Sequence, residues 1–379
     1  MKRRTYLGRV AVGVGICGGL SGCMEDRAGD ETQTPDAGQS EATATQNGSI
    51  TESTSNGSQS IAVETVVENL EVPWGAAYRG GTLYLTERPG RVVRVVDGAS
   101  EVVADFTGST QTGGEGGLLG LVFHPNDSAI AFTYQTYDDG SGRQNRIVRH
   151  NVANGWTREP LLDGIPGGTI HDGGRLFIHN GSLFATTGDA SESEDAQDTS
   201  VLNGKVLRLT LDGRPHPDNP FGNAVFTYGH RNPEGLATRD GALYAIEHGP
   251  SSDDEVNRLE KGGNYGWPEV TGPSDNPEFV DPVQTYEDII APGGGVFYAG
   301  PIEQWQGDLF IGTLAGEHLR RVRIRNGTVT EDEPLYDEYG RLRTTFVGPD
   351  NHLYATTSNR DGRGTPESGD DKVLRFRPA

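Results

Sequence analysis

Residues 227–268 combine histidine, arginine and acidic side chains with many glycines around one short apolar run, 242–247. Gly249-Pro250 turns the chain directly after this run, and the acidic triplet 253–255 follows. A turn frees backbone carbonyls from strand pairing, and carboxylates add hard oxygen ligands, which is the donor set that calcium prefers. The stretch therefore predicts a calcium site, although a plain acidic surface loop would have the same composition.

A histidine upstream of this stretch could transfer protons. His171 precedes Asp172 and the glycine pair 173–174, so its imidazole can approach a ligand closely and take a proton near neutral pH. Asp189 follows the next apolar run, and we expect its carboxylate to orient that imidazole. A loop histidine without a chemical role is the alternative.

Arginines in two further loops could bind negative charge. Arg231 could stabilise charge that develops during a reaction, and the adjacent Asn232 could fix a polar ligand. Arg341 and Arg343 alternate at strand spacing, so both guanidiniums lie on one face and could bind a multiply charged carboxylate or phosphate. Solvated arginines on the protein surface would give the same patterns.

Short strand-like runs separate these loops and recur along the chain. In each copy, a run of the form small-Leu-aromatic, ending near Thr, precedes a run of the form Val-x-Arg-Val/Leu. Six copies occur, at 82–86 with 91–95, 130–134 with 146–150, 182–187 with 205–209, 242–247 with 255–259, 308–313 with 318–322 and 352–357 with 372–376. Their starts lie about 44 to 66 residues apart, which is the period of propeller blades.

The repeat predicts an all-β chain folded as a six-bladed β-propeller, in which each copy supplies the inner and middle strands of a four-stranded blade. An array of unrelated hairpins is the alternative. Loops on one face of a propeller converge around its central channel, so residues far apart in the sequence can meet there. We expect this of the longer loops, at 113–121, 166–176, 188–200, 228–235, 247–255 and 339–343.

The composition limits the partners. The formal net charge is −22, and only four of the 32 basic residues are Lys. Such an acidic surface argues against nucleic acid and anionic lipid as partners. Because molar salt would screen the repulsion between its carboxylates, the composition also resembles that of proteins from halophilic, salt-loving microbes.

The N-terminal 60 residues predict export. Residues 1–23 combine Arg3-Arg4, a short apolar run and a lipobox-like end, which is typical of a twin-arginine (Tat) signal peptide whose Cys23 carries a lipid anchor. The run is too short and too broken by Gly for the alternative, a spanning anchor. Residues 24–60 predict a disordered Ser/Thr/Asp-rich linker, and 61–379 the folded domain. We therefore expect an extracytoplasmic lipoprotein on the outer face of the cell membrane.

Six motifs together resemble one known family. They are 114–121 with His124-Pro125, 171–176 (HDGGRL), 229–236 (GHRNPEGL), 249–257 (GPSSDDEVN), 262–268 (GGNYGWP) and 341–343 (RLR). Each motif is weak alone, but all six in this order resemble the soluble PQQ-dependent glucose and aldose sugar dehydrogenases, the glucose/sorbosone dehydrogenase family. The resemblance covers about residues 70–377 and implies a six-bladed propeller.

The resemblance also implies a role for each matching residue. His171 would be the general base, with Asp189 beside it and Arg231 near the reacting oxygens. Asn232, Arg341 and Arg343 would contact PQQ. The backbone carbonyls of Gly249 and Pro250 would bind the calcium that holds PQQ. Glu255 and the Tyr265 carbonyl would bind a second calcium.

Two positions depart from the family's pattern. Glu115 stands where the family usually has Gln, so an amide of the substrate pocket has become a carboxylate. The family has a PQQ-binding Lys on the fifth-blade loop, whereas the segment 312–320 has none. His318 or Arg320 is therefore expected to serve in its place.

The resemblance thus predicts a quinoprotein oxidoreductase that oxidises an aldose sugar at C1 to the lactone, with PQQ and Ca2+ as cofactors. The electron acceptor would be external, because the chain has no haem-attachment motif. One alternative is a calcium-stabilised propeller that binds glycans or proteins without catalysis, which the missing Lys favours. A calcium-dependent lactone hydrolase is another, but Arg341 and Arg343 have no role in it.

Overall fold

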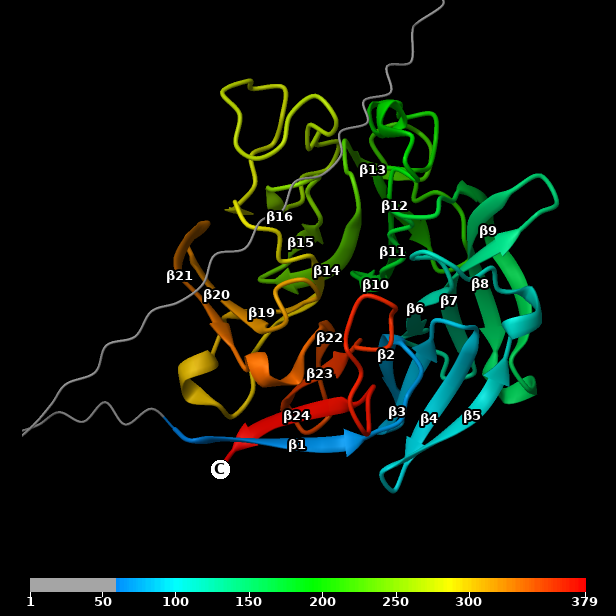
Figure 1. The fold of residues 1–379 in the computed structure, drawn as a ribbon. Coiled ribbons are helices and arrows are strands. Elements are labelled where there is room, and N and C mark those ends of the chain that lie inside the picture. Colours follow the sequence, from blue (N-terminus) through cyan, green and yellow to red (C-terminus); the bar gives the residue numbers. More distant parts are fainter. Residues whose placement is uncertain (1–58) are drawn as a thin grey trace, which may run out of the picture. The chain divides into compact units, whose positions relative to one another are not determined.

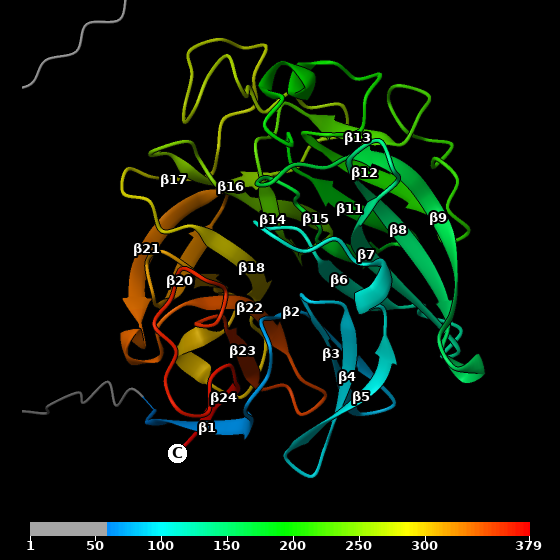
Figure 2. The same cartoon turned by 45° about the vertical axis from the view of Figure 1, so that its right-hand side comes forward.

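The computed structural model describes residues 59–379, and the predicted signal peptide, Cys23 and almost all of the linker lie outside this range. Its strands form six four-stranded antiparallel sheets arranged around a central axis, as Figures 1 and 2 show. The predicted all-β, six-bladed β-propeller is therefore confirmed.

The blades follow one another along the chain. Their strands are β2 (Pro73–Arg79), β3 (Thr82–Glu87), β4 (Arg91–Val96) and β5 (Ala99–Asp105); β6 (Leu118–Phe123), β7 (Ile130–Asp138), β8 (Arg143–Asn151) and β9 (Thr157–Pro166); β10 (Leu176–His179), β11 (Ser182–Thr187), β12 (Lys205–Thr210) and β13 (Val225–Tyr228); β14 (Pro233–Arg239), β15 (Ala242–Glu247), β16 (Asp254–Arg258) and β17 (Gln284–Tyr286); β18 (Pro292–Phe297), β19 (Leu309–Thr313), β20 (Leu319–Arg325) and β21 (Thr328–Leu335); and β22 (Leu342–Val347), β23 (Leu353–Thr357), β24 (Val373–Pro378) and β1 (Ile61–Val67). Short 3-10 helices occur at Thr107–Ser109, Val152–Asn154, Ser193–Gln197, Glu303–Trp305 and Asp337–Tyr339. Among the described residues, no helix is long and apolar enough to cross a membrane.

The ring closes through the N-terminal strand. β1 pairs antiparallel with β24, from Ile61 opposite Pro378 to Val67 opposite Val373, and so completes the sixth blade. Joining the two ends of the chain in one sheet leaves no gap between the first and last blades, because the inner strands β2 and β22 also contact each other.

The repeat detected in the sequence corresponds to the second and third strands of every blade, not to the inner and middle strands as predicted. The inner strands are β2, β6, β10, β14, β18 and β22, which contact their neighbours around the axis. The second strands stand out in the sequence because adjacent blades cover both of their faces, as in β11, where all six residues are buried.

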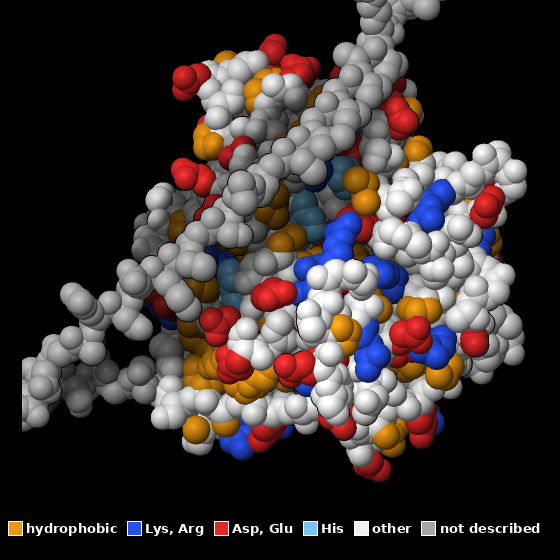
Figure 3. Space-filling model, in the orientation of Figure 1, with side chains coloured by type: hydrophobic (Ala, Val, Ile, Leu, Met, Phe, Trp, Pro, Cys, Tyr) orange, Lys and Arg blue, Asp and Glu red, His pale blue; other side chains and the backbone are white. Residues whose placement is uncertain are grey.

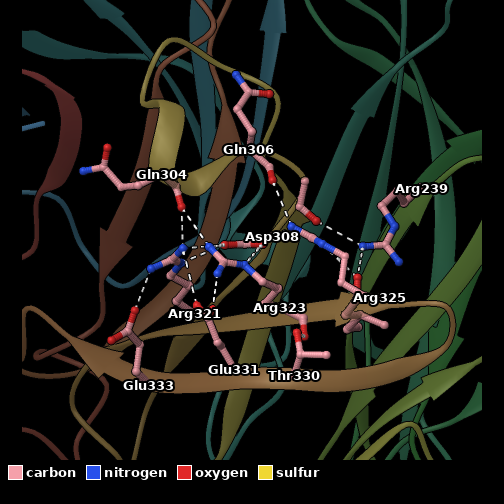
Figure 4. Close-up of polar contacts among 12 residues, drawn as sticks. Arg239, Gln304, Gln306, Asp308, Arg321, Arg323, Arg325, Thr330, Glu331 and Glu333 are labelled. Atoms are coloured by element: carbon pink, nitrogen blue, oxygen red, sulfur yellow. Dashed lines mark hydrogen bonds and ion pairs between the residues drawn. The ribbon is translucent and has the colours of Figure 1, made fainter. Parts of the chain in front are cut away.

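Blade five carries a network of ion pairs around one buried acid (Figure 4). The Asp308 carboxylate lies 2.7 Å from Arg321 Nη2, 3.1 Å from Arg323 Nε and 3.2 Å from Arg325 Nη2, three arginines on one face of β20. Asp308 is fully buried, so these partners offset the cost of removing its charge from water.

Candidate functional site

The predicted site residues lie on one face of the propeller. In an antiparallel meander, the loop before each inner strand and the loop between the second and third strands emerge at the same end of the blade. Glu115, His171 and Arg231 precede β6, β10 and β14, while Asp189 and Gly249 follow β11 and β15. Figure 3 shows a hollow near the centre of this face where basic and His side chains gather, with acidic side chains around it.

His171 and Asp189 form a hydrogen-bonded pair. His171 Nδ1 lies 2.7 Å from Asp189 Oδ1, and both side chains are buried. The loops approach this closely because residue 188 is Gly: a Cβ there would lie 2.0 Å from the His171 carbonyl oxygen. Since a carboxylate only accepts, Nδ1 carries the ring proton and Nε2 is left as the basic nitrogen.

Asp189 has further partners that keep it ionised. The Trp267 indole Nε1 donates to Asp189 Oδ2 at 2.8 Å, and the Ser191 backbone N–H donates to Oδ1 at 2.8 Å. Burial alone would raise the pKa of Asp189, but the hydrogen bond and charge of His171, together with these N–H donors, lower it below its usual value. The carboxylate is thus fixed in place as an anion that orients the imidazole.

Glu115 contacts the same histidine from the other side. Its Oε2 accepts the His171 backbone N–H at 2.7 Å, and its Oε1 lies 3.2 Å from Arg363 Nη1. Burial would raise the pKa of Glu115, but the charge of His248, the His171 N–H and Arg363 lower it. His171 itself has a left-handed backbone, φ 63°, which this hydrogen bond helps to hold.

Arg231 and Asn232 present unused hydrogen-bond donors. Arg231 lies over the Trp267 ring at 5.5 Å and donates to the His248 carbonyl at 3.3 Å, whereas its buried Nε has no partner. Asn232 Oδ1 accepts the Gly173 N–H at 3.1 Å, but its buried Nδ2 is also unpartnered. Buried donors without acceptors cost free energy, so both groups favour a polar ligand beside them.

Arg341 and Arg343 share one face, as their spacing predicted. Both reach Asp361 Oδ2, at 2.8 Å from Arg341 Nη2 and 3.7 Å from Arg343 Nη2. Arg343 also pairs with the buried Glu234 at 2.6 Å, and Arg88 donates to the Asp361 carbonyl at 3.1 Å.

Positive charge exceeds negative charge in this part of the channel. Arg341 and Arg343 pair with the carboxylates of Asp361 and Glu234, and Arg88 adds a third guanidinium, which donates to the Asp361 backbone carbonyl. Burial and the charge of Arg343 lower the pKa of Arg88. An anionic ligand would offset this excess.

A small cavity lies beside Gly249 and Pro250. It has a volume of about 20 Å³, and its wall also includes Glu247, Glu255 and Tyr265. Within residues 59–379, the carbonyl oxygens of Gly249, Pro250 and Tyr265 accept no hydrogen bond. These oxygens are therefore available to a cation.

Two buried carboxylates face each other near this cavity. Glu247 and Glu255 both accept from Asn257 Nδ2 at 2.8 Å. Burial and the charge of Glu247 raise the pKa of Glu255. In the described part of the chain, no group of three or more His, Cys, Asp or Glu side chains is arranged to hold a metal, so a cation here would depend on backbone carbonyls as well.

The structure does not bring Arg320 to the site. Its Nε lies 2.5 Å from Asp332 on β21, and its guanidinium covers the Tyr286 ring at 5.2 Å. His318 is buried, with Nδ1 2.6 Å from the Gly316 carbonyl oxygen. The expectation for Arg320 was wrong because side chains alternate along β20, and this position faces the outer strand and the neighbouring blade.

Sequence reasoning gave no role to three residues that the fold brings to the site. Arg88 and Arg363 line another small pocket of the candidate site, together with Glu115, Glu234 and Arg343. Trp267 contacts both Asp189 and Arg231. Only the aromatic residue inside the motif 262–268 offered a signal, because both arginines lie in loops without a motif.

Comparison with known proteins identifies the family. The sequence model of the Glucose / Sorbosone dehydrogenase family matches residues 70–366. Aldose sugar dehydrogenase from Escherichia coli (strain K12) is 30% identical, covering 80% of this chain and 91% of that protein. Quinoprotein glucose dehydrogenase B from Acinetobacter calcoaceticus is also 30% identical, covering 83% and 88%. The PQQ-bound structure of aldose sugar dehydrogenase from Streptomyces coelicolor matches with a TM-score of 0.77 at 34% identity, covering 84% of this chain and 98% of that one. This chain belongs to the glucose/sorbosone dehydrogenase family.

Proposed function

We propose that this protein is a PQQ-dependent aldose sugar dehydrogenase, which oxidises the anomeric carbon of an aldose to the lactone. Family membership and the PQQ-bound relative support the reaction class. The observation that carries the proposal in this chain is the His171–Asp189 pair, with Nδ1 2.7 Å from Oδ1, beside a channel that holds an excess of arginine.

The residues fit a tricarboxylate quinone. The unpartnered Arg231 Nε and Asn232 Nδ2 supply donors, and the guanidiniums of Arg341 and Arg343 supply positive charge on one face. When bound, PQQ would supply the hydride acceptor that no side chain can provide. The free carbonyls of Gly249 and Pro250 would hold a calcium that binds and polarises it.

The chain itself would manage the proton and the orientation of the sugar. His171 Nε2 would accept the proton of the anomeric hydroxyl, because Nδ1 is occupied by Asp189. Asp189, held ionised by its donors, would stabilise the imidazolium that forms. Arg231 would stabilise negative charge on the reacting oxygen, and Glu115 would contact the sugar hydroxyls. The electrons leave to an external acceptor.

Reconstitution tests this proposal. The protein in high salt is mixed with calcium and PQQ, the quinone absorbance is recorded, and an aldose is added. We expect bleaching with the wild type and none with His171→Ala. His179→Ala is the matched control, because His179 ends β10 on the opposite face and should leave turnover unchanged. PQQ binding without reduction by any aldose, or no PQQ binding, would favour a calcium-held propeller that binds glycans or proteins instead.

The second calcium site is part of the proposal. Glu255 and the Tyr265 carbonyl would hold a structural Ca2+ between Glu247 and the motif 262–268. The elevated pKa of Glu255 supports this, because a cation would relieve the repulsion between the two carboxylates. Calcium should therefore raise the thermal unfolding midpoint of the wild type more than that of Glu255→Gln, which keeps only the site at Gly249 and Pro250.

We also propose that the protein is exported and anchored by a lipid on Cys23. The support is the sequence of residues 1–23 and the acidic composition. Cell fractionation should find the wild type in the membrane pellet and Cys23→Ser in the soluble extracytoplasmic fraction.

A further inference from the structure

The central channel contains a second cavity, on the face opposite the candidate site. Its volume is about 310 Å³, and the inner strands of all six blades line it. Outside β10, most lining residues lie toward the second ends of these strands, such as Tyr78 of β2 and Val347 of β22, whereas the candidate site lies at their first ends. The two cavities therefore open toward opposite faces.

The side chain of Arg175 lies at the end of this cavity nearest the candidate site, because the residue directly precedes β10. Its Nε donates to the Glu234 carbonyl at 2.8 Å, and its Nη2 donates to Thr344 Oγ1 at 3.0 Å. The guanidinium also covers the Trp74 ring at 4.2 Å. These contacts fix Arg175 across the axis at the inner end of the second cavity.

The wall of this cavity is apolar except at that end. Its lining residues include Tyr78, Leu121, Phe123, Val296 and Phe346. The polar groups in the wall are engaged elsewhere: Thr345 Oγ1, for example, donates to the Phe310 carbonyl at 2.8 Å. A concave apolar wall of this volume suits a small organic ligand better than water.

Arg175 has binding capacity left at this point. A guanidinium has five N–H donors, and the two bonds above use two of them. Among the described residues, Nη1 has no protein acceptor, and the carboxylate of Glu234 is taken by Arg343 at 2.6 Å. Burial lowers the pKa of Arg175 to about 9.

From the cavity and its single cation we propose a second ligand site, which binds a small carboxylate with an apolar or aromatic body. The carboxylate would contact Arg175 Nη1, and the body would lie between Tyr78, Phe123 and Phe346. The volume suits a ligand of roughly ten to fifteen non-hydrogen atoms. This site is distinct from the sugar site, and the proposal does not rest on the proposed function.

Calorimetric titration of the full-length protein with trans-cinnamate tests the site. We expect binding with a Kd on the order of 0.1 mM. Cinnamyl alcohol, which has the same body without the charge, should bind at least roughly tenfold more weakly, because it lacks the ion pair with Arg175.

Two variants locate the binding. Val296→Trp fills the cavity and should weaken cinnamate binding at least roughly tenfold. Val102→Trp, on an exposed outer strand, is the matched control and should leave it unchanged. Arg175→Met should abolish the difference between cinnamate and its alcohol. The proposal is overturned if cinnamate does not bind, if the alcohol binds equally well, or if binding survives Val296→Trp. Binding that survives Val296→Trp would place the ligand on the arginines of the other face.

Discussion

Trp267→Phe isolates the role of one hydrogen bond in the candidate site. Phe keeps an aromatic ring beneath Arg231, which lies 5.5 Å from the Trp267 ring, and removes only the indole N–H and part of the ring area. That N–H is the donor to Asp189 Oδ2, at 2.8 Å. Asp189 Oδ1 keeps its bonds to His171 and Ser191.

The expected magnitude follows from burial. Asp189 is 1% exposed, so Oδ2 would lose its partner without gaining water. A buried charged group left unpaired in this way costs roughly 2 kcal/mol. If the full cost appears in the reaction, kcat/KM for an aldose falls roughly 30-fold, with kcat rather than KM carrying the loss, because the sugar contacts remain.

Two measurements test this effect. The first is kcat/KM of the PQQ-loaded enzyme as a function of pH, where the acid limb should move to higher pH, because the pKa of Asp189 rises when the carboxylate loses the Trp267 donor. The second is the free energy of unfolding in urea. The pKa of Asp189 is lowered in the fold, so its contribution to stability is present above about pH 4 and is lost as the pH falls further. The gap between wild type and Trp267→Phe should therefore be largest near neutral pH and close in acid.

Trp156→Phe is the matched control, since Trp156 is buried in the second blade, away from the site. It should lose stability while kcat stays within about twofold of the wild type. The reasoning is refuted if Trp267→Phe also keeps its kcat and pH profile, because the indole would then support the fold without positioning Asp189.

Other predictions concern charge and pH. Asp308→Asn should lower the free energy of unfolding in urea by roughly 3–5 kcal/mol, because three arginines of β20, of which Arg321 is buried, lose the carboxylate that they share. The half-exposed Glu331→Gln should cost under about 1 kcal/mol, and equal losses would contradict this. Burial lowers the pKa of His150 to about 4, below the value of about 6.5 in the unfolded chain. The unfolded state therefore binds a proton before the folded state does, and the fold loses roughly 3 kcal/mol of stability as the pH falls from 6.5 toward 4. Urea midpoints between pH 7 and 4.5 should therefore fall less in His150→Gln than in the wild type, and parallel curves would count against this. Glu115→Gln removes a negative charge beside the arginines that line the same pocket, so it should tighten PQQ binding roughly threefold to tenfold. A fluorescence titration with PQQ measures this, and weaker binding would show that the carboxylate does not face the cofactor.

Much of the fold could be predicted because the repeat depends on local burial. Strands such as β11 and β15 are covered on both faces by adjacent blades, so they appear as short continuous apolar runs at regular intervals. The closing pair of β1 and β24 could not be predicted this way. That pairing joins the two ends of the domain, and no local pattern marks which strand will be its partner.

The candidate site divides in a similar way. The sequence indicated the loops that carry His171, Asp189 and Arg231, because glycine-rich turns after short strands leave few positions for such side chains. It could not show that Trp267 donates to Asp189, since the two residues are far apart in the chain. It also misplaced Arg320, because the direction of a side chain depends on which face of β20 meets its neighbours.

The sequence by itself determined the all-β blade period, the residues available for chemistry and their family, because each of these is written in local composition and spacing. Only the tertiary structure decided which of them meet. The arrangement of the blades about the axis sets His171 against Asp189 and Glu115, brings Arg88, Arg341 and Arg343 to the same two acidic residues, and places Arg175 at one end of the second cavity. Most of these contacts join loops or strands that are far apart in the sequence, so they depend on how the blades pack.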